Sequence, residues 1–233
     1  MHAPAQGTEG TVYFGWRDSD LFPVAIKVPH GGNEEALRLE AEALSSLCHP
    51  NIVPLLAAPT IADGRTVIVM PMLMPLAYFL PMTTTGARGV LLDVLAALEY
   101  IHGKGRIQGD LRVGNVALND ERRAILLDFS NHLSRSPRTP DQIMAPELIR
   151  GASHSPQSDI YAAGLLAMEL IGAPFIAPGE SLPQMVDAHL YRSIPPVFGA
   201  SEWNAAIAKA CAKDPDARYG NALEMRRVIE ALA

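Results

Sequence analysis

The sequence predicts an α+β fold with two lobes, a small strand-rich lobe followed by a larger helical lobe. In the first part of the chain, apolar residues alternate with other residues, which is typical of strands. Beyond Pro81 they recur at helical spacing instead. An apolar connector rich in methionine and proline joins the two parts. With 233 residues, of which 48% are hydrophobic and 19% charged, the chain can bury a substantial core.

The predicted small lobe contains strands and one helix. Residues 22–29 are expected to form a strand, because Val24, Ile26 and Val28 occupy alternate positions. An amphipathic helix is predicted over 34–47, and Asn33 is its expected N-cap residue. Two more strands are expected at 51–56 and 65–70.

The predicted large lobe is mainly helical. Its first helix ends at Gly103 and Gly105, and its apolar stripe consists of Leu91, Leu95, Leu98 and Ile101. Short strands are then expected at 106–107, 116–118 and 124–127. The last part of the chain is expected to be helical, with helices near 158–171 and 221–232. In the final helix, Asn221 and Glu224 have the spacing of a capping box.

Charge and composition restrict the possible partners and compartment. The chain has 25 acidic and 19 basic residues and no run of Lys and Arg, so we do not expect it to bind nucleic acid. Cys48 and Cys211 are far apart and lack metal-ligand spacing, and nothing indicates an oxidising compartment, so a cytoplasmic location is predicted. The apolar run 67–82 contains three prolines and is too short to cross a bilayer, so we expect no membrane segment.

Two features of the small lobe suit the binding of phosphates. Gly7 and Gly10 lie in a loop where the absence of Cβ atoms lets backbone N–H groups approach a phosphate. Lys27 lies on the strand 22–29, and Glu40 lies on the apolar face of the following helix, where it needs a cation as its partner. Taken singly, the glycines also fit an ordinary turn, and Lys27 also fits an edge position in a sheet.

Two features of the large lobe suit phosphoryl transfer. Asp110 and Asn115 lie five residues apart in a loop, where a carboxylate could orient a hydroxyl while an amide oxygen binds Mg²⁺. Asp128 follows the apolar strand 124–127 and is well placed as a metal ligand. Each of these residues, taken alone, also fits a simple turn.

These motifs follow one another in the order found in the eukaryotic-type protein kinase family, which the chain resembles from about Ala5 to Leu232. The matching segments are the glycine-rich loop Gly7 to Tyr13, Val-Ala-Ile-Lys ending at Lys27, His-Pro-Asn-Ile-Val after Glu40, the loop containing Asp110 and Asn115, Asp128-Phe129, Met144-Ala145-Pro146-Glu147, Ser158-Asp159-Ile160-Tyr161, and Asp214-Pro215 with Arg218. The resemblance implies a bilobal protein-kinase-like fold. It places the small lobe at 1–70, the hinge at 71–76 and the large lobe at 77–233.

The resemblance also implies a role for each site residue, with ATP and Mg²⁺ as cofactors. Lys27 would clamp the phosphates, Glu40 would hold Lys27, and Asp110 would orient the substrate hydroxyl with Arg112 beside it. Asn115 and Asp128 would bind Mg²⁺. The nucleotide would be contacted by Gly7, Gly10, Val12, Ala25, Lys27, Met70, Pro71, Leu73 and Ala117. An ion pair between Glu147 and Arg218 is expected as well.

Several positions depart from the family pattern. Ala5 replaces a glycine of the phosphate loop and almost nothing precedes it, so the first strand should be short and nucleotide binding looser. The motif His-Arg-Asp appears as Gln108-Gly109-Asp110, which removes the arginine that commonly binds an activation-loop phosphate. Ser130 replaces the glycine after Asp-Phe, which should restrict swings of Asp128. Candidate phosphorylation sites in the segment that follows are Ser134, Ser136 and Thr139.

The leading hypothesis is a kinase that transfers the γ-phosphate of ATP to Ser or Thr hydroxyls of protein substrates. The basic residue Arg112 favours Ser/Thr over Tyr substrates without deciding between them. The main alternative is a pseudokinase that binds nucleotide or acts as a scaffold, which Ala5, Gln108, Gly109 and Ser130 motivate. A third reading is a small-molecule kinase. A regulatory protein is a further possible partner, and the oligomeric state stays open.

Overall fold

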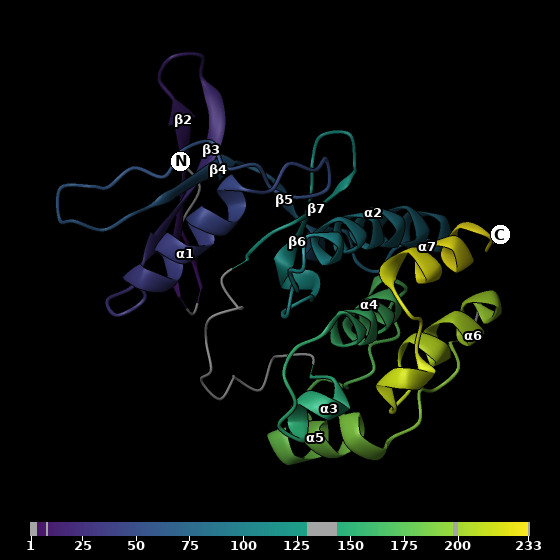
Figure 1. Cartoon of the computed structure of the whole chain (residues 1–233). Helices are drawn as coiled ribbons and strands as arrows, with labels where there is room; N and C mark the ends of the chain where they lie inside the picture. The colour runs from purple at the N-terminus through teal and green to yellow at the C-terminus, as the bar shows by residue number, and fades with distance from the viewer. Residues whose placement is uncertain (1–3, 8, 130–143, 198–199, 233) are drawn as a thin grey trace.

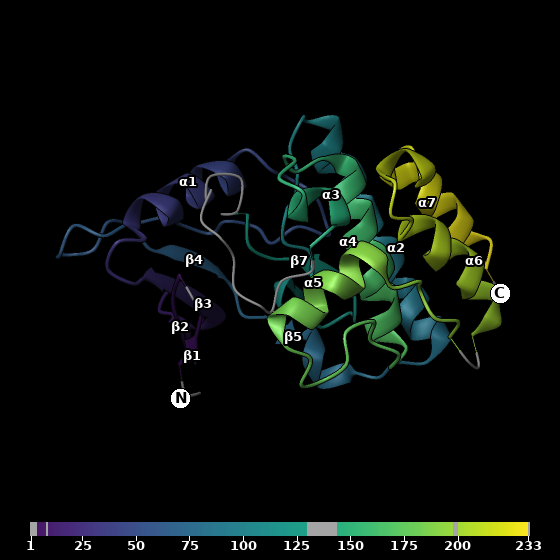
Figure 2. The same cartoon turned by 90° about the horizontal axis from the view of Figure 1, so that it is seen from below.

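The computed structural model describes residues 4–7, 9–129, 144–197 and 200–232. A four-stranded antiparallel sheet with α1 against it forms one end of the molecule, and the long helices form the other end (Figure 1). The same separation is visible after a 90° turn (Figure 2). The described chain therefore has the two-lobed α+β arrangement that the sequence predicts.

The first sheet contains four strands in the order β1-β2-β3-β4. Their bounds are β1 Ala5–Gln6, β2 Gly10–Arg17, β3 Phe22–Pro29 and β4 Ile68–Pro71. The predicted strand 22–29 is confirmed. Among the described residues, β1 is as short as expected, since Ala5 and Gln6 pair with β2. Val12 pairs with Lys27, and Ala25 pairs with Met70. This register brings the phosphate loop, the lysine strand and the connector side by side.

The helix α1 spans Glu34–Ser45, two residues shorter than predicted. Near its end, the Ser45 and Ser46 hydroxyls donate to the carbonyls of Glu42 and Ala43, and such bonds compete with the helical backbone. Asn33 holds the N-cap position, but its side chain does not cap the helix and instead donates to the Glu9 carbonyl at 3.2 Å. The predicted N-cap position of Asn33 is therefore confirmed, while its side chain ties the start of α1 to the turn that contains Glu9.

A second sheet, in the order β5-β6-β7, connects the lobes. Its strands are β5 Met74–Pro75, β6 Val116–Leu118 and β7 Ala124–Leu126, so two predicted strands are present and the second ends one residue early. Short 3-10 helices flank it, η1 at Leu76–Phe79 and η2 at Val113–Asn115. The Asn115 carbonyl accepts from Leu127 N at 2.8 Å, which places Asn115 beside the residue before Asp128.

Three expected strands differ from the structure. Residues 51–56 form no strand, because Val53 N donates to Leu126 while Leu56 N donates to Val69, and Pro54 has no N–H to donate. Residues 106–107 form none either, because Arg106 N donates to Ile101 at the end of α2. The strand expected at 65–70 begins only at Ile68 and extends to Pro71.

The helical lobe is built around two buried helices. They are α2, Thr84–Gly103, and α4, Pro156–Leu170. The predicted stripe of α2 is confirmed, since its four residues Leu91, Leu95, Leu98 and Ile101 are fully buried. Around these helices lie α3 Pro146–Ile149, α5 Leu182–Tyr191, α6 Ser201–Ala210, η4 Pro215–Ala217 and α7 Ala222–Glu230. Within the described residues, every helix is too short or too polar to cross a bilayer.

The helix α4 begins at Pro156, two residues before the predicted start, and Ser155 is its N-cap residue in a capping box. The capping box predicted for the last helix is only partly present. Asn221 caps α7, since its side chain accepts from Glu224 N at 2.9 Å. The Glu224 carboxylate accepts from Gly220 N instead of Asn221 N, so the reciprocal half of the predicted box is absent.

His189 of α5 predicts a pH dependence of stability. It is buried, and its Nδ1 lies 2.9 Å from the Tyr161 hydroxyl. Burial lowers the pKa of His189 from its ordinary 6.5 to about 4, and the nearby Lys213 and Arg192 charges act in the same direction against Glu180. Between these two values the unfolded chain binds the proton and the folded chain does not. The contribution of His189 to the free energy of unfolding should therefore fall by up to about 3 kcal/mol as the pH drops from 7 towards 4.

Urea denaturation at pH 7 and pH 4.5 measures this effect. His189→Asn places an amide oxygen where it can still accept from Tyr161, and it cannot take up a proton. The variant should be less stable at pH 7 but should lose less stability between the two pH values than the parent protein. Identical losses in both proteins would contradict the assignment.

Candidate active site

A cavity of about 370 Å³ lies where the two sheets meet. Its small-lobe lining includes Gly7, Gly10, Val12, Ala25, Lys27 and Glu40. Its lining from the connector and the large lobe includes Met70, Pro71, Leu73, Arg112, Asn115, Ala117 and Asp128. The structure thus brings every predicted site residue to one cavity except Asp110, which reaches it through Asn115.

Lys27 is the centre of charge in this cavity. Its Nζ donates to Glu40 Oε2 at 2.8 Å and to Asp128 Oδ2 at 3.3 Å, so the expected contact with Glu40 is present. Burial lowers the pKa of Lys27, but the charges of Asp128 and Glu40 outweigh it and hold this pKa above its ordinary value. Lys27 therefore stays charged and is available to an anion that enters the cavity.

Glu40 is almost fully buried on α1. Burial raises the pKa of Glu40 to about 7, with Asp128 adding to the effect and Lys27 opposing it. Burial and the nearby negative charge of Asp128 thus disfavour the ionised form of Glu40, and the Lys27 ammonium stabilises it.

Gln108 ties the catalytic loop to the Asp128 segment. Its side chain is fully buried, and its Nε2 donates to the carbonyls of Leu127 at 3.1 Å and Asp128 at 2.9 Å. Its Oε1 accepts from Asp110 N at 2.8 Å. Both ends of the amide are used, so the polar side chain suits its buried position. Gln108 thereby fixes Asp110 and Asp128 relative to one another.

Asp159, at the start of α4, binds the backbone of the loop that contains Gln108 and Asp110. Its carboxylate accepts from Gln108 N at 2.8 Å and from Gly109 N at 2.9 Å. His102 Nε2 lies 2.8 Å from the same carboxylate. The sequence indicated only that Asp159 begins a helix, because its partners lie about fifty residues away in the chain. It is a positioning residue that the sequence did not reveal.

Asp110 and Asn115 lie in direct contact. Asn115 Nδ2 donates to the Asp110 carbonyl at 2.7 Å and to Asp110 Oδ2 at 2.9 Å, and both side chains are buried. Arg112 Nε lies 3.5 Å from Asp110 Oδ2. Because the Asn115 amide nitrogen faces Asp110, its amide oxygen is the atom suited to a metal ion.

The backbone of Asp128 is left-handed, with φ of 55°. Aspartate tolerates this conformation better than most residues, but it is still uncommon outside glycine. Strain of this kind often marks a functional site. Ser130, Ser134, Ser136 and Thr139 lie outside the described residues.

A buried ion pair joins Glu147 of α3 to Arg218, which follows η4. Arg218 donates to both Glu147 oxygens at 2.7 Å, and its guanidinium also donates to the carbonyls of Gln157 and Ala212. The predicted pair of Glu147 and Arg218 is therefore confirmed.

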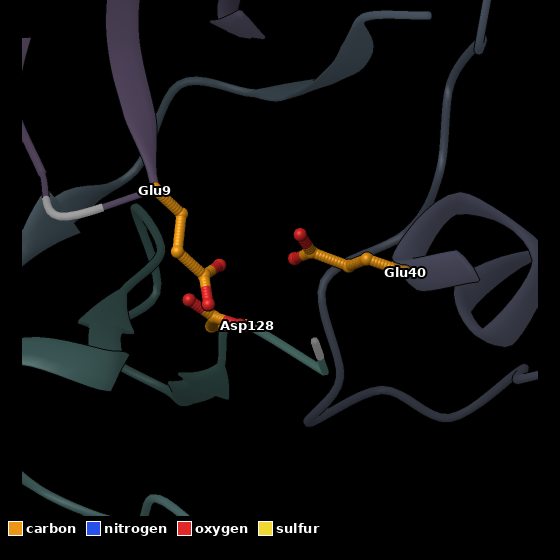
Figure 3. A group of neighbouring side chains, drawn as sticks. All are labelled: Glu9, Glu40 and Asp128. Atoms are coloured by element: carbon orange, nitrogen blue, oxygen red, sulfur yellow. The ribbon is translucent and has the colours of Figure 1, made fainter. Parts of the chain in front are cut away.

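Glu9 is a cavity residue that the sequence did not single out. Its carboxylate lies 3.6 Å from Lys27 Nζ, and Figure 3 shows it pointing towards Asp128 with Glu40 across from them. The only available signal was its position between Gly7 and Gly10, in a loop expected to hold phosphates.

Comparison with known proteins gives a consistent result. The family model for the protein kinase domain matches residues 5–226. Mitogen-activated protein kinase kinase kinase 17 of Arabidopsis thaliana is 29% identical, over 80% of this chain and 55% of the relative. The probable serine/threonine-protein kinase PknB of Lactococcus lactis is 28% identical, over 87% of this chain and 36% of the relative. Serine/threonine-protein kinase PknL of Mycobacterium tuberculosis is 28% identical, over 98% of this chain and 64% of the relative. The chain thus spans only part of each relative's length.

Proposed function

This chain belongs to the protein kinase family, and from that premise we propose that it transfers the γ-phosphate of ATP to serine or threonine hydroxyls of a protein substrate. The observation that carries the proposal is the contact of Lys27 with Glu40 and Asp128, in one cavity with Asn115 and its partner Asp110. The two bacterial relatives are named serine/threonine-protein kinases, which supports the choice of hydroxyl.

The cavity suits a nucleotide in size and lining, since sites for small molecules measure about 300–1,000 Å³. The base would lie between Val12 and Ala25 above and Ala117 below, against the connector Met70, Pro71 and Leu73. The phosphates would lie under Gly7 and Gly10, with Lys27 as their cation.

The transfer step needs a positioned hydroxyl and a proton acceptor. The hydroxyl oxygen attacks the γ-phosphorus while the bond from that phosphorus to the β-phosphate oxygen breaks. Asp110 orients the hydroxyl and accepts its proton. Arg112, beside Asp110, places positive charge near the transferred group. Gln108 and Asp159 hold the loop that carries Asp110.

The donor set fits a magnesium ion. Asn115 and Asp128 both border the cavity, and amide and carboxylate oxygens are ligands that Mg²⁺ accepts. The ion would neutralise phosphate charge during transfer.

We also propose the division into a small lobe at 1–70, a hinge at 71–76 and a large lobe at 77–233. It is supported by β4, which ends at Pro71, and by β5, which pairs with β6. A cytoplasmic location is proposed from the two cysteines, which are not paired with one another.

Mass spectrometry after incubation with ATP and Mg²⁺ tests the function. Phosphate should appear on Ser or Thr of the protein when it is incubated alone, or of a general protein substrate when one is added. No phosphate should appear in a parallel incubation with a non-hydrolysable ATP analogue. Nucleotide binding without transfer to any protein would overturn the proposal and favour the pseudokinase.

Activity is expected to be independent of phosphorylation in the segment between Asp128 and Glu147. Gly109 stands where an arginine would bind the phosphate, and its φ of 73° disfavours any side chain. Treatment with a phosphatase, with phosphate removal verified by mass spectrometry, should leave the initial rate within about twofold. Loss of activity would show this prediction to be wrong.

A further inference from the structure

Glu9 faces the cavity from the turn between β1 and β2, and the transfer step described above does not use it (Figure 3). Its backbone is held firmly. The Glu9 carbonyl accepts from His30 N at 2.9 Å and from Asn33 Nδ2 at 3.2 Å, and Gly7 N donates to Gly10 O at 2.9 Å across the turn. The carboxylate therefore starts from a fixed point above Lys27.

Three carboxylates share the Lys27 ammonium. Their oxygens lie 2.8 Å from Nζ for Glu40, 3.3 Å for Asp128 and 3.6 Å for Glu9. Even with Glu40 partly protonated, Glu9 and Asp128 together carry more negative charge than the single ammonium of Lys27 balances. Because the glycine-rich turn and Lys27 would bind the phosphates, this excess lies where a triphosphate must enter.

Of these three acids, Glu9 is the one in the glycine-rich turn that is proposed to bind the phosphates. Glu40 approaches from α1 and Asp128 from the segment after β7, whereas Glu9 belongs to the turn that would cover the phosphates. Its side chain is also the most exposed of the three carboxylates, although only 25% exposed. A phosphate that reaches Lys27 must therefore lie close to the Glu9 carboxylate or displace it.

We propose that Glu9 makes nucleotide binding depend on a divalent cation, because its carboxylate repels a triphosphate whose charge no cation has neutralised. The inference rests on the proposed nucleotide site. Mg²⁺ bound to the phosphates offsets part of their charge and weakens the repulsion, so the effect of Glu9 is larger on the metal-free nucleotide. Glu9 thus acts as a specificity determinant that selects the metal complex of ATP.

Calorimetric titration with ATP, once in EDTA and once in excess Mg²⁺, tests this idea. Glu9→Gln keeps the size of the side chain and removes its charge. It should raise the affinity for metal-free ATP about tenfold and the affinity for the magnesium complex less than about threefold. Glu42→Gln is the matched control, since it makes the same charge change on the exposed face of α1, where Glu42 pairs with Arg38. It should change neither affinity.

Each other outcome is informative. Equal affinities of Glu9→Gln and the parent protein in EDTA would overturn the inference while leaving the nucleotide site intact. Weaker binding of the magnesium complex by Glu9→Gln would also overturn it and make Glu9 a metal ligand. If the parent protein bound neither form of ATP, the nucleotide site itself would be rejected and the inference with it.

Discussion

Asp110→Asn should reduce the rate of phosphoryl transfer by about 10²–10⁴-fold, the usual contribution of a positioned acid or base. The amide cannot accept the hydroxyl proton in the way that the carboxylate does. The substitution is nearly isosteric, and the amide oxygen can still accept the bond that Asn115 Nδ2 now donates to Oδ2. The loop should therefore keep its shape while the chemistry is lost.

The expected loss is confined to the chemical step. Among the described residues, Asp110 is not part of the lining of the cavity, so the affinity for ATP should stay within about threefold of the parent value. Initial rates with labelled ATP and calorimetric binding measure the two quantities separately. Asp120→Asn, an exposed aspartate of the same lobe, is the control and should leave both unchanged. Equal transfer by Asp110→Asn and the parent protein would remove Asp110 from the mechanism.

Much of the fold could be predicted because it follows local patterns. The alternation of Val24, Ile26 and Val28 marks a strand that the structure contains, and the apolar stripe of α2 marks a face that the structure buries. The segments 51–56 and 106–107 could not be predicted in this way. Their backbone groups bond to Leu126, Val69 and the end of α2, and these partners follow from tertiary structure, not from periodicity.

The site was predictable to the extent that its chemistry requires particular residue types. Lys27, Glu40, Asp110, Asn115 and Asp128 stand in an order that a known family shares, and the structure brings them together. The supporting contacts were not predictable, since Asp159 contacts the loop of Asp110 only because α4 begins beside that loop in the fold. Glu9 was missed for a different reason, because an acid among phosphate-binding glycines runs against the expected charge.

Arg218→Met should be the most destabilising of the changes considered. The Arg218 side chain is fully buried, and its loss leaves the Glu147 carboxylate, 13% exposed, without its cation. The carbonyls of Ala212 and Gln157 lose their donor as well. Removing one partner of a buried pair costs about 3–5 kcal/mol. For a chain of this size, that corresponds to a drop of about 6–20 °C in melting temperature.

Thermal and urea denaturation of a double-mutant cycle separates the pair from its surroundings. Glu147→Gln in the Arg218→Met background should recover part of the lost stability, because it removes the unpaired charge that dominates the cost. Arg17→Met provides the control, since Arg17 and Asp20 form a solvent-exposed pair that contributes little to stability. If Arg218→Met were no more destabilising than Arg17→Met, the pair of Arg218 and Glu147 would not be what holds α3 against α4. The link between Glu147 and the helical core would then have to come from packing alone.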